Sequence, residues 1–182
     1  MYKLDLKKSR SLLNVRRLNF ERCNRYENVA EHSLYVGIIA YQLAYALEYG
    51  ENVARHCLKL GIMHDLAEAV TGDIPFLTRR AMGDTVVNGL DYMGNQELGI
   101  DLKKHPYEHI VEVADILEFA LYLQEEIKSG NTNLNDIYAE TLNRLVGYLD
   151  NQLYRKYICD LLGMSSTEII DNAKEMIDGI KH

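Results

Sequence analysis

The sequence predicts an all-α fold arranged as a single-domain helical bundle. Apolar residues recur every three or four positions along most of the chain, which is the period of an amphipathic helix. No convincing alternating strand pattern or internal repeat accompanies them. The 182 residues suit one domain with a hydrophobic core, and no Gly-, Ser- or Pro-rich stretch resembles a linker. We therefore expect residues 1–182 to form one domain, with a motif-bearing core at about 10–150 and further helices at 151–182.

Three helices and a shorter helical region are expected in the first half of the chain. Residues 4–18 are periodic and amphipathic. Residues 31–50 are very apolar and stop at a glycine, and residues 52–70 close with the turn sequence Thr-Gly-Asp. A shorter helical region continues from Pro75 to about residue 98.

The second half of the chain predicts three more helices. The first starts at Pro106, a favoured residue for the first helical position, and stops at Gly130. A long helix is expected over residues 134–162. The last one follows Ser165, which forms a capping-box pattern with Glu168.

Composition narrows the class of protein. A formal charge of −7 argues against long nucleic acid as a partner, because its backbone is held mainly by clustered Lys and Arg. The N-terminal segment lacks the apolar core of a signal peptide, and no run reaches the roughly 18 apolar residues of a membrane span. The cysteines Cys23, Cys57 and Cys159 are widely spaced and suggest no disulfide framework. We expect a soluble cytoplasmic protein with a small-molecule ligand and no membrane partner.

Four polar residues stand in the most apolar helices: His32, His64, Asp65 and Asp115. A buried, ionised carboxylate without a partner is costly, so Asp115 must meet a cation, a hydrogen-bond network or water. One divalent metal ion shared by all four side chains satisfies them together. Two imidazoles and two carboxylates suit Co²⁺, Mn²⁺, Zn²⁺ or Mg²⁺, and open positions leave room for water and a phosphate oxygen.

The order of these residues, a histidine, then a His-Asp pair, then an aspartate on another helix, resembles the signature of the HD-domain phosphohydrolases. The segments "RLNFERCNRYENVAEHSLYVGIIAYQLA", "LGIMHDLAEAVTGDIP" and "VEVADILEFALYLQEEIKSGN" are similar to those of the YfbR-type 5′-deoxynucleotidases. The short insert before Asp115 is similar to the compact phage dATP triphosphohydrolases of the DatZ type, in the same group. The resemblance covers roughly residues 10 to 150.

The resemblance implies roles by position. The four residues above would bind the metal, while Glu68 and Asp73 would be the catalytic carboxylates. Glu68 follows His64 by four residues, which places both on one face of a helix. Asp73 is also explained as an ordinary turn residue. Arg17 matches the arginine that holds the phosphate, and a guanidinium fork suits a phosphate dianion.

Other residues are expected around the substrate. Leu18 stands where relatives commonly carry a tryptophan that packs on the sugar, so deoxyribose selectivity is left open. Phe20 is near Arg17 in sequence and is expected to contact the base or sugar. Pro75 and Arg79, with Arg80, are expected to lie over the same cleft, where the arginines would contact additional phosphates.

We therefore expect a phosphohydrolase that cleaves the bond between the 5′ oxygen and the α-phosphorus of (deoxy)nucleotides, most favourably deoxyadenylate. Two alternatives stay open, a dATP triphosphohydrolase that releases triphosphate and a catalytically silent module that senses nucleotides. The family resemblance also suggests a homo-oligomer, for which the tyrosine- and leucine-rich helices could supply an interface.

Overall fold

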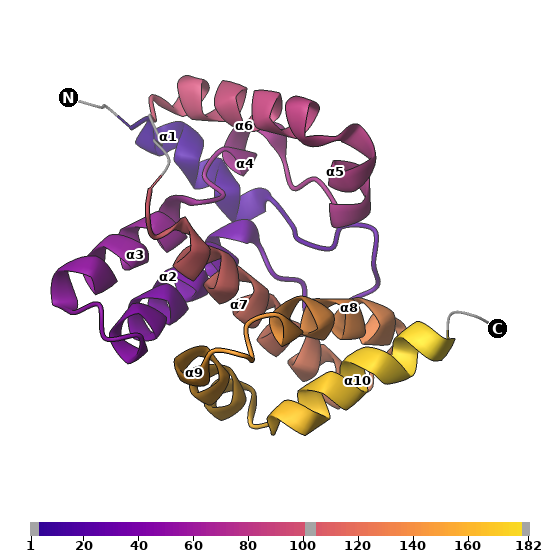
Figure 1. The fold of residues 1–182 in the computed structure, drawn as a ribbon. Coiled ribbons are helices and arrows are strands. Elements are labelled where there is room, and N and C mark those ends of the chain that lie inside the picture. Colours follow the sequence, from indigo (N-terminus) through magenta and orange to yellow (C-terminus); the bar gives the residue numbers. More distant parts are fainter. Residues whose placement is uncertain (1–3, 101–104, 180–182) are drawn as a thin grey trace.

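The computed structural model describes residues 4–100 and 105–179, with only the backbone placed for residues 76, 77, 80 and 175–179. Within them the regular elements are all helices, which confirms the all-α prediction (Figure 1). In the same part of the chain, none of these helices has the length and apolar character needed to cross a membrane.

Three helices pack against one another: α2 (Val29–Ala46), α3 (Glu51–Met63) and α7 (Glu108–Lys128). The C-terminal helices α8 (Asn135–Val146), α9 (Gln152–Leu162) and α10 (Ser166–Gly179) gather on one side of α7 (Figure 1). One hydrophobic core runs through both groups, and its largest fully buried members include Leu43, Ile110, Ile116, Leu117, Leu123, Leu142, Leu145, Ile158 and Ile169. The segment after residue 150 therefore packs into the same core as α2 and α7.

A second group of helices lies on the side of the molecule away from α8, α9 and α10 (Figure 1). It contains α1 (Leu6–Ser9), a 3-10 helix (Arg10–Asn14), α4 (Glu68–Thr71), α5 (Phe76–Met82) and α6 (Asp84–Leu98). A smaller cluster of Leu12, Val29, Leu66, Leu98 and Ile100 holds this group together. The start of α1 is tied to the end of α6, because the Asp5 N–H donates to the Leu98 carbonyl at 3.0 Å.

The prediction of one helix over residues 4–18 is wrong. Helical structure ends at Asn14, and the chain then runs extended beside the residues that precede α2. The Val29 N–H donates to the Val15 carbonyl at 2.9 Å, and the Arg17 N–H donates to the Glu27 carbonyl at 3.0 Å. These long-range bonds satisfy the backbone groups that a helix would have paired locally.

Two other predicted helices are interrupted. The helix expected over 52–70 stops at Met63, and residues 64–67 form a tight turn in which the Glu68 N–H donates to the Asp65 carbonyl at 3.0 Å. The helix expected over 134–162 breaks between α8 and α9, where the Asn151 side chain accepts hydrogen bonds from the N–H groups that begin α9. The asparagine cap competes there with helix continuation.

Helix caps elsewhere follow the sequence. The predicted capping box is confirmed, because Glu168 accepts from the Ser165 N–H at 2.7 Å and Ser165 Oγ accepts from the Glu168 N–H at 3.2 Å. A second capping box starts α2, between Asn28 and Glu31. It fixes the first turn of α2, which carries His32.

Candidate metal and catalytic site

The site lies where α2, the α3–α4 turn and α7 meet, and the extended segment before α2 closes one end of it. Residue 16 pairs with Asn28 in an isolated antiparallel bridge. Since alternate residues of an extended segment point to opposite sides, Arg16 and Arg17 diverge. The Arg16 guanidinium lies over the Tyr26 ring at 4.8 Å, whereas Arg17 reaches Glu118 on α7. This pairing explains how Arg17 enters the site.

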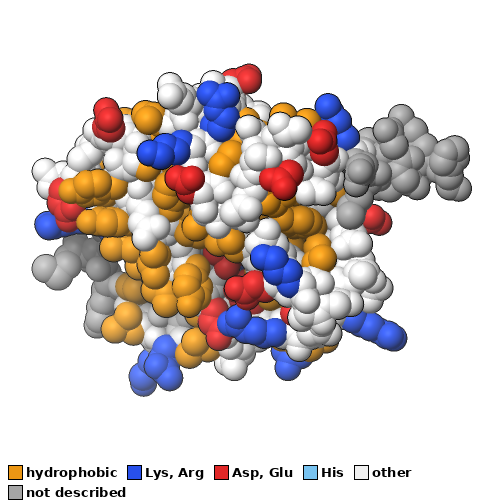
Figure 2. Space-filling model, turned by 90° about the horizontal axis from the view of Figure 1, so that it is seen from below, with side chains coloured by type: hydrophobic (Ala, Val, Ile, Leu, Met, Phe, Trp, Pro, Cys, Tyr) orange, Lys and Arg blue, Asp and Glu red, His pale blue; other side chains and the backbone are white. Residues whose placement is uncertain are grey.

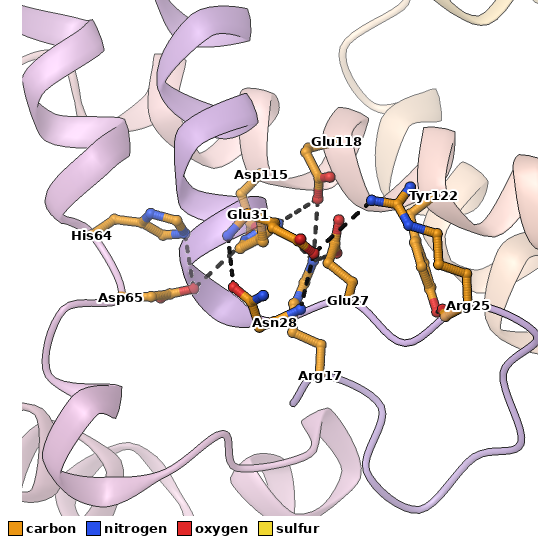
Figure 3. Close-up of polar contacts among 11 residues, drawn as sticks. Arg17, Arg25, Glu27, Asn28, Glu31, His64, Asp65, Asp115, Glu118 and Tyr122 are labelled. Carbon is orange, nitrogen blue, oxygen red and sulfur yellow. Dashed lines mark hydrogen bonds and ion pairs between the residues drawn. The ribbon is translucent and has the colours of Figure 1, made fainter. Parts of the chain in front are cut away.

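The four predicted metal ligands are brought together, and Figure 3 labels three of them, His64, Asp65 and Asp115. His32 Nε2 lies 3.1 Å from Asp115 Oδ1 and 3.6 Å from Asp65 Oδ2, and His64 Nε2 lies 3.0 Å from Asp65 Oδ2. One ligand atom from each of His32, His64 and Asp115 lies within 4.8 Å of the others, which is close enough to share an ion. Asp65 borders this group through its contacts with both histidines.

Both histidines point their Nε2 atom toward the carboxylates of this group. Within the described residues, Nε2 of His32 and Nε2 of His64 are buried and have no hydrogen-bond partner. Nδ1 of His64 is engaged instead, because it lies 2.6 Å from the Gly61 carbonyl, to which it can only donate. In the neutral ring, this leaves the lone pair on Nε2 of His64. Imidazole nitrogens and carboxylate oxygens that face one another form a ligand set that suits a divalent cation.

The electrostatics of these residues favour a positive charge at their centre. Burial lowers the pKa of His64, but the Asp65 carboxylate outweighs burial and raises that pKa to about 9. Burial also raises the pKa of Asp115, yet the close contact of its carboxylate with the His32 ring and the charge of that ring hold the pKa below its ordinary value. Protons and a metal ion therefore compete for the same group of atoms.

Two buried glutamates complete the site, and the sequence interpretation missed both. Arg17 Nη1 lies 3.1 Å from Glu118 Oε2 and 3.3 Å from Glu27 Oε2. Burial and repulsion from Glu118 raise the pKa of Glu27 to about 7. Glu27, His32 and Glu118 also offer ligand atoms within 4.8 Å of one another, but the Arg17 guanidinium already provides a cation there. The available signal was spacing, because Glu118 follows Asp115 by one helical turn.

Glu68 is buried at 6% exposure at the start of α4, and Asp73 follows in the turn after that helix. Burial, with repulsion from Asp65 and Asp73, raises the pKa of Glu68 to about 9. Burial likewise raises the pKa of Asp73, against the effect of Arg17. The two carboxylates therefore belong electrostatically to the same site. A perturbed carboxyl group beside a candidate metal centre is typical of catalytic acids and bases.

The remaining predicted substrate residues occupy different places. Leu18 packs against the main core with a left-handed φ of 48°. Phe20 is 79% exposed. Pro75 precedes α5. Arg79 on that helix forms an ion pair with Asp91 of α6 at 3.1 Å. The positive charge of Arg79 also opposes the rise in the pKa of Glu68. The Arg80 side chain lies outside the described residues.

Fold and site together define the class of protein. The HD domain family matches residues 10–156, and this chain belongs to that family. A 5′-deoxynucleotidase from Shewanella oneidensis is 28% identical, over 84% of this chain and 88% of its own length. A shorter stretch, 28% of this chain, is 43% identical to the 5′-deoxynucleotidase YfbR of Salmonella arizonae, covering 27% of that protein.

Solved structures share the fold at lower identity. An HD-domain phosphohydrolase from Listeria innocua superimposes with a TM-score of 0.70 at 18% identity, covering 95% of this chain and 96% of its own. The cyanophage S-2L HD phosphohydrolase DatZ, bound to dA and one catalytic Zn²⁺ ion, gives a TM-score of 0.66 at 15% identity, covering 96% of this chain and 99% of its own.

Proposed function

We propose that this chain is a metal-dependent phosphohydrolase that cleaves the bond between the 5′ oxygen and the α-phosphorus of deoxynucleotides, with deoxyadenylate as the favoured substrate. One observation carries the proposal. The Nε2 atoms of His32 and His64 are buried, have no hydrogen-bond partner among the described residues, and converge with the Asp115 carboxylate. The similarity to 5′-deoxynucleotidases supports the choice of substrate class.

His32, His64, Asp65 and Asp115 would hold one divalent ion, with Zn²⁺, Co²⁺, Mn²⁺ and Mg²⁺ as candidates. When bound, such an ion polarises a phosphoryl oxygen and brings the pKa of water toward ~7. The partial exposure of Asp65 and Asp115 leaves this group open on one side. That opening would admit the phosphate.

Glu68 and Asp73 would be the catalytic carboxylates. Because its pKa is raised to about 9, Glu68 keeps its proton at neutral pH in the protein without a metal ion. A protonated carboxyl can give its proton to the departing 5′ oxygen, while a neighbouring carboxylate orients water. We assign the first role to Glu68 and the second to Asp73.

Arg17 would bind the phosphate. Its three short contacts all use Nη1, and the side chain keeps 16% exposure at the edge of the site. Glu118 and Glu27 hold the guanidinium in one orientation, which reduces the entropy lost when a phosphate binds. Leu18 and Phe20, from the same loop, would contact the sugar or base. The Asn19 side chain of this loop donates to the Asp73 carbonyl at 3.4 Å, so the loop lies beside the segment that carries Asp73.

Triphosphate cleavage is the second candidate. The short insert before Asp115 favours it. Arg79 favours it as well, because its positive charge is near enough to Glu68 and Asp73 to lower the pKa of both carboxyl groups. Pro75 fixes the start of the helix that carries Arg79. The fold similarity to DatZ is compatible with both substrates.

The proposal extends to a homo-oligomer in the cytoplasm. Large apolar side chains on α2 are about half exposed, namely Leu34, Tyr35 and Tyr45. Figure 2 shows hydrophobic side chains gathered on one side of the face that it views, beside a central group of charged residues. Three free cysteines suit a reducing compartment. Light scattering of the purified chain measures its oligomeric state.

Product analysis in H₂¹⁸O tests the function. The metal-loaded chain is incubated with ribo- and deoxynucleotide mono- and triphosphates. We expect labelled phosphate and unlabelled deoxyadenosine from dAMP. Labelled intact triphosphate from dATP identifies the second candidate. Label in the nucleoside contradicts attack at phosphorus, and hydrolysis of neither substrate with any metal favours the nucleotide-sensing module.

A further inference from the structure

The Nδ1 side of His32 differs from that of His64. His32 is completely buried, and its Nδ1 atom contacts Glu118 Oε2 closely. Arg17 Nη1 lies 2.6 Å from the same Nδ1 and 3.1 Å from the same oxygen. Three groups therefore meet at one point, and the position of a single proton decides how they bond.

Hydrogen-bond chemistry limits the arrangements. A guanidinium only donates, and an ionised carboxylate only accepts. A neutral imidazole donates through one ring nitrogen and accepts at the other. If Nδ1 of His32 accepted from Arg17, the ring proton would sit on Nε2, which would then have no lone pair for a metal ion. If Nδ1 donates to Glu118, Nε2 keeps its lone pair. Glu118 Oε2 then accepts from both neighbours.

We propose that Glu118 is a positioning residue that holds His32 in the tautomer whose Nε2 is free to bind the metal ion. The inference rests on the proposed function, since it takes His32 as a ligand. It parallels His64, where the Gly61 carbonyl accepts from Nδ1. Outer acceptors of this kind fix ligand orientation in metal sites, and their loss costs roughly 10–100-fold in metal affinity.

Burial makes Glu118 suited to this role. The residue is 5% exposed on a helix whose neighbouring positions are apolar, so the orientation of its side chain is fixed by the few polar groups within reach. Glu27 also pairs with Arg17, but its contact of 3.3 Å is longer than the 3.1 Å contact of Glu118. Arg17 thus retains one carboxylate partner when Glu118 is replaced.

The test measures zinc affinity by competition with a chelator and records the ring N–H signals of His32 in ¹H–¹⁵N spectra of the zinc-loaded protein. Glu118→Ala should lower zinc affinity roughly 10–100-fold and abolish the protected Nδ1–H signal. Glu118→Gln keeps an acceptor oxygen, so its affinity should lie closer to that of the wild type. Glu126→Ala is the matched control, because this buried glutamate of α7 binds backbone N–H groups of residues 24 and 25 and should leave zinc affinity unchanged.

A folded Glu118→Ala variant with wild-type zinc affinity overturns the proposal. The wild type gives a second test that does not depend on any variant folding. Its zinc-loaded spectrum should show metal on Nε2 and a proton on Nδ1 of His32. Zinc on Nδ1 overturns this inference but leaves the proposed function standing. A wild-type chain that binds no divalent ion overturns the proposed function together with this inference.

Discussion

Gly37 of α2 and Gly61 of α3 place the backbones of their helices in direct contact. A Cβ atom built at Gly61 would lie 2.7 Å from Gly37 Cα and 2.8 Å from Gly37 N. Such separations require the helices to move apart. The contact lies within about two helical turns of each histidine, because Gly37 follows His32 on α2 and Gly61 precedes His64 and accepts the hydrogen bond from that ring.

Gly61→Ala should therefore destabilise the protein by about 1–3 kcal/mol, the usual cost of overpacking, and weaken metal binding. Urea unfolding and chelator competition measure the two effects. Gly89→Ala is the control, since a Cβ at Gly89 on α6 meets nothing within 4 Å and alanine favours a helix. Equal stability of both variants would show that α2 and α3 tolerate the extra atom.

Replacing Glu68 with Ala should lower turnover by roughly 10²–10⁴-fold while metal binding persists, because a lost general acid affects the reaction rather than the ligand set. Steady-state turnover and metal content, measured on the same preparation, separate the two properties. The exposed Glu112 on α7 supplies a control substitution. Turnover near that of the wild type would return Glu68 to a structural role.

The raised pKa of Glu68 also predicts a pH effect on stability. The ordinary pKa of 4.5 rises to about 9 through burial, so between these values the unfolded chain is ionised while the folded chain keeps the proton. The unfolded state then binds fewer protons, and stability falls as pH rises. Glu68→Gln removes this contribution. In metal-free protein, its advantage in urea midpoint over the wild type should widen from pH 5 to pH 9, whereas parallel profiles contradict the assigned pKa.

Arg79→Ala should harm triphosphate turnover more than monophosphate turnover. Additional phosphates need additional cationic contacts, and a charge-assisted hydrogen bond contributes roughly 1.5–3 kcal/mol. The wild-type side chain must leave Asp91 or bridge to it, since the two pair at 3.1 Å. Comparing kcat/KM for dAMP and dATP measures the difference, with the exposed Arg55→Ala as control. Equal losses on both substrates exclude a role specific to the longer phosphate chain.

Local pattern predicted much of the architecture, but long-range pairing was not visible in it. The helical period identified the apolar helices and the Ser165–Glu168 cap, because these depend on neighbouring residues. The extended course of residues 15–17 depends on pairing with residues 27–29, so the prediction of one helix over residues 4–18 was wrong. The α3–α4 turn was missed because its i to i+3 bonds suit the same apolar sequence as a helix.

The candidate site shows the same division. Polar residues in apolar helices identified His32, His64, Asp65 and Asp115, and the structure brings these four side chains together. Glu118 was missed although it shares that signal, because its partners Arg17 and His32 lie far away in sequence. The roles of Leu18, Phe20, Pro75 and Arg79 stay predictions, since substrate contacts are not fixed by sequence pattern or by the protein's own packing.

Metal content and turnover measured together test the central claim most directly. The wild type and His109→Ala, which changes an exposed histidine of α7, should bind one divalent ion per chain and hydrolyse the nucleotide. His64→Ala and Asp115→Ala should lose ion and turnover together, because each removes one ligand and its share of charge and geometry. Full metal occupancy with undiminished turnover in both ligand variants would contradict the account.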